Sequence, residues 1–151
     1  MLKLSECASF ASVSNDAPLD ADGFLRLAER KRAAALALVD NSLAAGEAWM
    51  AAGYAVEFAL KACVMRREGL GAWPAKKTRP ELYTHNLREL FRLAGIELGS
   101  APEEVRAPLR TVLDWDRALE YNLTVISPAQ ARTMVAAAFG ESGVVAWLIG
   151  L

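Results

Sequence analysis

Residues that cross-link a chain or bind metal are scarce in this sequence. It contains two cysteines, Cys7 and Cys63, and a single histidine, His85. Two thiols are too few for a disulfide framework, so we expect both to stay reduced. They also form no metal-ligand pair, and neither a glycine-rich phosphate loop nor a Ser/His/Asp arrangement is present in the sequence. The sequence therefore predicts neither a metal site nor a bound cofactor.

An excess of one charge and a long apolar run are also missing. Lys and Arg number 17 against 18 Asp and Glu, and this net charge of −1 excludes a globally cationic nucleic-acid-binding protein. No uncharged apolar stretch reaches the roughly 18 residues that a membrane span requires. The first residues carry Glu6 and several serines where a signal peptide has an apolar run. We therefore expect a cytoplasmic protein with no membrane partner.

Helix-forming residues dominate what is present. Ala and Leu account for 29 and 21 of the 151 residues, and both favour helices. Strand-like alternation is absent apart from the short stretch 123–126. A hydrophobic content of 54% excludes intrinsic disorder, and the length fits one domain. We predict an all-α fold, an up-and-down bundle of about five helices over residues 20–151, preceded by a flexible lead-in over residues 1–19.

Helix boundaries follow from capping residues and from the spacing of apolar side chains. The predicted helices cover residues 20–43, 45–68, 84–95, 100–121 and 127–148. The second helix is apolar over most of its circumference, which places it in the middle of the bundle. Pro108 is expected to kink or split the fourth helix, and Gly140 and Gly143 are expected to weaken the last one.

The balanced total charge hides a local positive excess. Residues 61–92 hold eight Lys or Arg and three Glu, a net of +5, whereas the remainder has a net charge of −6. Part of the excess lies in the loop after the second helix, where Lys76, Lys77 and Arg79 follow Trp73. This cluster is a candidate site for a nucleotide or an RNA backbone, with Trp73 stacking on a base. The alternative is a solvated loop that Trp73 anchors to the core.

Glu57 and Lys61 are one helical turn apart on the otherwise apolar second helix. On a helix surface such a pair contributes only roughly a few tenths of a kcal/mol. On a largely buried helix the same charges, together with Tyr54, would mark a groove or a dimer interface. Both interpretations remain open from the sequence.

Several short motifs occur in an order that resembles the HEPN domain family. The second helix carries Tyr54-x-x-Glu57-x-x-x-Lys61-Ala62, and after a Gly/Pro loop the next helix opens with His85-Asn86-Leu87-x-x-Leu90. Further on, Trp115 and Tyr121 precede a polar loop and a Ser-Pro helix start, similar to the later helices of the family. The resemblance covers residues 20–148. Asn86 stands where the common form of the family has Asp.

The resemblance implies a nucleotide-related function. HEPN domains are four- to five-helix bundles that often form homodimers, and many are paired with a minimal nucleotidyltransferase in toxin–antitoxin or defence-type systems. It therefore implies a module that binds a nucleotide or RNA, or that only pairs with a nucleotidyltransferase or another effector without catalysing a reaction. A third hypothesis is a purely structural adaptor with no nucleotide-related function.

Some HEPN proteins are metal-independent ribonucleases with an Arg-x(4–6)-His motif, which makes a ribonuclease toxin the alternative function. Arg79 and His85 have this spacing, so the imidazole would act as acid or base and the guanidinium would bind the phosphate. Two features of the sequence argue against a catalytic role for Arg79 and His85. Pro80 places Arg79 in an extended loop, and His85 fits better as a first-turn residue of its helix. After Arg117, in the later helices where the catalytic motif normally lies, no histidine follows.

Overall fold

The fold is all-α, as the sequence predicts. The computed structural model describes residues 17–121 and 125–151, and no strand occurs among them. The α-helices are α1 (Ala21–Leu38), α2 (Ala45–Glu68), α3 (Leu87–Leu93), α4 (Glu103–Leu113), α5 (Pro128–Phe139) and α6 (Val144–Ile149). Three short 3-10 helices connect them: η1 (Pro80–Tyr83), η2 (Leu98–Ser100) and η3 (Arg117–Tyr121).

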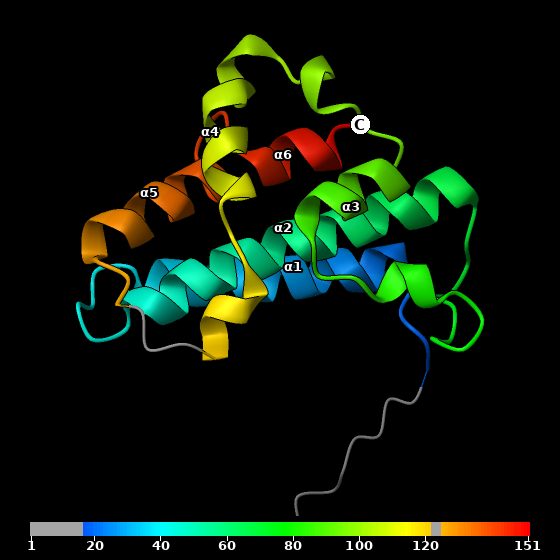
Figure 1. Cartoon of the computed structure of the whole chain (residues 1–151), viewed down its shortest axis with the longest axis horizontal. Coiled ribbons are helices and arrows are strands. Elements are labelled where there is room, and N and C mark those ends of the chain that lie inside the picture. Colours follow the sequence, from blue (N-terminus) through cyan, green and yellow to red (C-terminus); the bar gives the residue numbers. More distant parts are fainter. Residues whose placement is uncertain (1–16, 122–124) are drawn as a thin grey trace, which may run out of the picture.

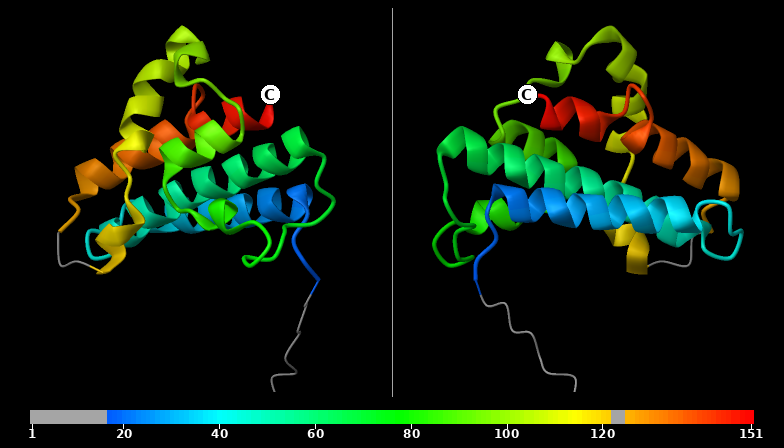
Figure 2. Two further views of the ribbon diagram at one scale, coloured as in Figure 1. Left: turned by 45° about the vertical axis from the view of Figure 1, so that its right-hand side comes forward. Right: turned by 180° about the vertical axis from the view of Figure 1, so that it is seen from behind.

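The central element is α2. Sixteen of its 24 residues are buried, because α1 covers one side of it while α3, α5 and α6 pack on the others (Figure 1). Figure 2 shows α1 in front of α2 when the molecule is seen from behind. The central position and the bounds 45–68 that the sequence predicts for this helix are both confirmed. The helix α4 crosses the other helices steeply and packs on α5 (Figure 1).

Two helices end earlier than the sequence predicts. The first stops at Leu38 instead of residue 43, because Asn41 forms a turn in which its side chain accepts a hydrogen bond from the Leu43 amide. The fourth stops at Leu113 instead of residue 121, because the chain turns so that Trp115 enters the core. Of the two outcomes expected at Pro108, a kink or a split, the split does not occur, since α4 continues through that residue. Pro108 has no N–H to donate to the Glu104 carbonyl in the first turn, so α4 continues with one backbone hydrogen bond fewer.

Two other helices differ at their starts or in their middle. The third is capped by the Asn86 side chain, which accepts from the Glu89 amide, and not by Thr84. Gly95, with a φ of +67°, follows its end as predicted. The last predicted helix is interrupted after Phe139, so that α5 and α6 are separate, in agreement with the weakening expected from its two glycines.

The predicted lead-in lies mostly outside the described residues, as do three residues of the loop before α5. Within the described part, the Leu19 carbonyl accepts a hydrogen bond from the Trp73 amide, which joins the start of the bundle to the loop after α2. Two stretches, Ala45–Glu68 and Pro128–Ile149, are long and apolar enough to cross a membrane by length and composition alone. In the first, 83% of the most apolar window is buried inside the bundle, as is usual for a core helix.

Candidate functional site

Three polar side chains lie along one side of α2. Tyr54, Glu57 and Lys61 share this side because they are three and four residues apart. Glu57 is 1% exposed and Lys61 is 7% exposed, and the Lys61 ammonium donates to Glu57 Oε1 at 2.6 Å. The pair is therefore buried, and the surface ion pair that the sequence left open is not what the structure shows.

His85 completes the environment of the Glu57 carboxylate. Its Nδ1 lies 3.0 and 3.1 Å from the two carboxylate oxygens. Because a carboxylate only accepts hydrogen bonds, Nδ1 carries the proton in this contact. The imidazole is 40% exposed, and its Nε2 makes no hydrogen bond with the residues that the structure describes. A buried carboxylate thus orients a histidine whose second nitrogen is available to a ligand.

Tyr54 joins the same side of α2 to η3. Its hydroxyl accepts a hydrogen bond from Arg117 Nε at 3.1 Å and donates one to Glu120 Oε2 at 3.1 Å. Burial raises the pKa of the Tyr54 hydroxyl above its usual value, and Glu120 acts in the same direction while Arg117 opposes it. The Tyr54 contacts hold the Arg117 side chain beside α2, and Arg117 lines the same pocket as His85.

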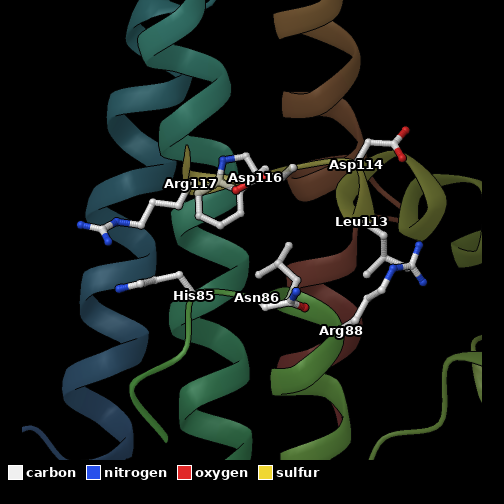
Figure 3. Close-up of a pocket in the computed structure, with 9 residues that line it drawn as sticks. His85, Asn86, Arg88, Leu113, Asp114, Asp116 and Arg117 are labelled. Atoms are coloured by element: carbon white, nitrogen blue, oxygen red, sulfur yellow. The ribbon is translucent and has the colours of Figure 1, made fainter. Parts of the chain in front are cut away.

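A pocket of about 330 Å³ lies between the start of α3 and the turn after α4. It is lined by residues 85–88 and 113–117, including three basic side chains (His85, Arg88 and Arg117) and two acids, Asp114 and Asp116. Figure 3 shows the His85 and Arg117 side chains pointing to the same side of the pocket, with Arg88 and Asp114 at the opposite side. The pocket therefore offers N–H donors at both sides and carboxylate acceptors between and beside them.

Arg79 does not line the pocket of His85. Its guanidinium bonds to Glu68 at 2.9 Å and also to Glu81, and both acceptors lie near the loop after α2. These ion pairs raise the pKa of Arg79 and lower those of Glu68 and Glu81. The spacing of Arg79 and His85 in the sequence is thus not matched by a shared pocket.

Trp73 packs inward rather than facing the neighbouring lysines. Its ring meets Phe24 edge-on at a centroid distance of 5.0 Å, and the Lys61 ammonium lies 5.8 Å from its centroid. This is the anchoring role that the sequence left as the alternative. Lys76 and Lys77 are exposed and form no ion pair within the described part of the chain. Trp73 thus packs against the core, while Lys76 and Lys77 lie exposed on the loop.

Arg88 and Arg117 line the pocket, although neither was a candidate site residue on the basis of the sequence. For Arg117 the signals were its proximity to Trp115, a residue of the family resemblance, and its position where the catalytic motif of the family normally lies. Arg88 lies in the first turn of α3, and it lines the pocket because the end of α4 packs close to that turn.

Two further observations bear on identity. Among the described residues, no three His, Cys, Asp or Glu side chains come together as a group that would hold a metal ion. Comparison with protein-family models, with curated proteins and with solved structures found no match. The family resemblance therefore rests on the motifs of this chain.

Proposed function

We propose that the chain is a HEPN-like helical module that binds a nucleotide or RNA phosphate beside His85 and pairs with a separate effector. By the resemblance, the effector is a nucleotidyltransferase or another protein of a toxin–antitoxin or defence-type system, and the module itself is a cytoplasmic homodimer. The observation that carries the binding site is that His85, fixed by the buried Glu57, lines the same pocket as Arg88 and Arg117.

The charges of the pocket fit a nucleotide better than a simple anion. Arg88 forms no ion pair in the described residues, and Arg117 uses its Nε for Tyr54 and Glu120, which leaves its terminal nitrogens without a hydrogen bond among those residues. Guanidinium groups bind phosphate through paired N–H donors. Asp114 and Asp116 would repel phosphate, but carboxylates accept hydrogen bonds from ribose hydroxyls and base amino groups. A ligand with both parts would satisfy both kinds of side chain.

Titration calorimetry with AMP, ADP, ATP and inorganic phosphate tests this proposal. We expect a nucleotide to bind more tightly than phosphate, and Arg88→Gln to weaken binding by about tenfold or more, the effect of losing a hydrogen bond between charged groups. The matched control is Arg132→Gln, an exposed arginine of α5 that does not line the pocket. Absence of nucleotide binding, or equal effects of the two variants, would reject the pocket.

Effector pairing and self-association need separate measurements. The proposal expects a stable complex when the chain is co-expressed with a nucleotidyltransferase encoded next to it, and a dimer by analytical ultracentrifugation. A complex without any nucleotide binding would favour the purely structural adaptor. A monomer at micromolar concentration would contradict the homodimer.

The alternative function, a metal-independent ribonuclease, is supported by one specific feature of the site. A histidine whose Nδ1 is held by a buried carboxylate and whose side chain is 40% exposed has the orientation of a general base or acid. Cleavage of RNA in the presence of EDTA would identify this activity. If it occurs, we expect His85→Gln and Arg117→Gln to abolish it, whereas Arg79→Gln retains it because Arg79 is held by Glu68 and Glu81. Cleavage that survives His85→Gln would reject His85 and Arg117 as the catalytic pair.

A further inference from the structure

Three hollows of the surface meet at Arg88. The pocket beside His85 is one of them, a second of about 530 Å³ lies between α3 and α4, and a third of about 440 Å³ lies between the ends of α2 and α3. Arg88 is the residue that lines all three. The hollows therefore adjoin, and they form one concave face on the side of the molecule where α3 and α4 lie (Figure 1).

This face is positively charged although the whole chain is not. Six arginines line the three hollows against four acidic residues, whereas the chain has a net charge of −1. Three of the six are paired with a glutamate: Arg92 with Glu89, Arg106 with Glu103 and Arg117 with Glu120. We name it the Arg88 face and define it by Arg67, Arg88, Arg106 and Arg110, with His85 at one end. Three of them, Arg67, Arg88 and Arg110, form no ion pair within residues 17–121 and 125–151, the part of the chain that the structure describes. Of the four arginines that define the Arg88 face, only Arg106 is neutralised by an ion pair in the described residues, with Glu103.

Two of these guanidinium groups are fixed in place by the backbone. Arg67 donates to the Leu93 carbonyl at 3.0 Å and packs over Gly95, where an added Cβ would lie 2.5 Å from the guanidinium carbon. Arg106 donates to the Ala101 carbonyl at 3.2 Å. A carbonyl orients a guanidinium without cancelling its charge, so Arg67 loses little further freedom when an anion binds. Arg106 is oriented in the same way but also pairs with Glu103 at 2.5 Å.

We propose that the Arg88 face binds the phosphodiester backbone of a single-stranded nucleic acid across several successive nucleotides. The inference rests on the proposed function, because one of its hollows is the nucleotide pocket beside His85. Each hollow has the volume of a small-molecule site, and consecutive hollows suit the unstacked nucleotides of a flexible strand better than a stiff duplex. Leu98, Leu109 and Leu113 line the middle hollow and offer an apolar surface to a base. Arginines that contact phosphates give affinity without sequence preference.

Fluorescence anisotropy with labelled oligonucleotides of twelve nucleotides tests the proposal, using single-stranded RNA, single-stranded DNA of the same sequence and the RNA duplex. We expect a single strand to bind more tightly than the duplex, with an affinity that falls as salt rises. Arg110→Gln should weaken binding by about tenfold and reduce the slope of log affinity against log salt by about 0.7, the value for one phosphate contact in a single strand. Arg132→Gln should change neither quantity.

The variant Arg110→Gln also separates this inference from the proposed function. Arg110 does not line the pocket beside His85, so AMP binding should be unchanged by its substitution. AMP binding without oligonucleotide binding would overturn the inference and leave the proposed function intact. Equally tight duplex binding, an oligonucleotide affinity insensitive to Arg110→Gln, or competition by poly-glutamate as strong as that by RNA would also overturn it, the last by identifying a surface for an acidic protein.

Discussion

The Glu57 carboxylate neutralises Lys61 inside the bundle, so replacing it leaves a positive charge in a buried site. We expect Glu57→Gln to lower the free energy of unfolding by about 3–5 kcal/mol, as for other buried ion pairs that lose one partner. Urea denaturation followed by circular dichroism measures this change. Glu89→Gln is the matched control, because Glu89 pairs with Arg92 on the surface, where solvent screens the pair and its loss should change stability little.

The double variant Glu57→Gln with Lys61→Met identifies the cause. If the loss arises from an uncompensated ammonium, removing that ammonium restores much of the stability. A double variant no more stable than Glu57→Gln would show instead that the bond from His85 dominates.

Gly53 allows the Trp115 indole to lie directly against α2. A Cβ at this position would be 2.0 Å from Trp115 Nε1, so Gly53→Ala must displace the indole or the helix. We expect a loss of about 1–3 kcal/mol in the free energy of unfolding. Gly46→Ala on the same helix meets nothing within 4 Å and should instead stabilise the protein by about 0.5–1 kcal/mol. The two melting temperatures should therefore move in opposite directions from wild type, and a stabilised Gly53→Ala would contradict this packing.

At the scale of single residues, the sequence predicted the Glu57–Lys61 contact but not the side chains that surround it. An i, i+4 spacing is local, whereas the bond from His85 to Glu57 joins residues 28 positions apart and depends on how α3 packs on α2. The same reason explains Arg117, whose bond to Tyr54 spans 63 positions. Spacing along the chain paired His85 with Arg79, because it contains no information on the acids that hold Arg79.

Among the elements, α5 has the most complete N-terminal cap. Ser127 accepts a hydrogen bond from the Gln130 amide while the Gln130 side chain accepts one from the Ser127 amide. Ser127→Ala should lower the free energy of unfolding by about 1 kcal/mol. Thr133→Ala, one and a half turns into the same helix, removes an exposed hydroxyl that only bonds back to Ala129 and should change stability by less than about 0.5 kcal/mol. Equal thermal shifts for the two variants would show that the cap contributes nothing.

Helix boundaries were predictable where a local signal acts alone. The start of α5 at Ser-Pro and the whole of α2 agree with the sequence, since capping residues and apolar spacing are properties of neighbouring residues. The ends of α1 and α4 do not agree. In α4 the residues beyond Leu113 are compatible with a helix, but burial of Trp115 against Gly53 favours a turn there.

For the molecule as a whole, stability should fall at alkaline pH. Burial raises the pKa of the Cys63 thiol above its usual 9.0, so above pH 9 the folded chain retains a proton that the unfolded chain releases. The folded state then binds more protons, and the free energy of unfolding decreases as pH rises through this range. Urea midpoints between pH 7 and 10 should show the decline, and Cys63→Ala should make it shallower. An identical decline in the variant would assign it to other groups.

The all-α class and the central place of α2 follow from composition and periodicity, which act on the whole chain. The arrangement of the remaining helices does not, because the steep crossing of α4 depends on which apolar faces meet. The pocket beside His85 lies at that crossing, where α4 ends beside the start of α3. It was therefore the part of the molecule that the sequence described least.

The position of α2 also determines how the molecule can open. Its partners α1, α3, α5 and α6 come from before and after it in the chain, and each covers a different part of its surface. Its backbone amides are therefore shielded by all of them at once, and local fluctuations of one partner expose few of these amides. Hydrogen exchange in α2 should require unfolding of the entire bundle, so that its slowest amides report the global stability while those of η3 exchange earlier.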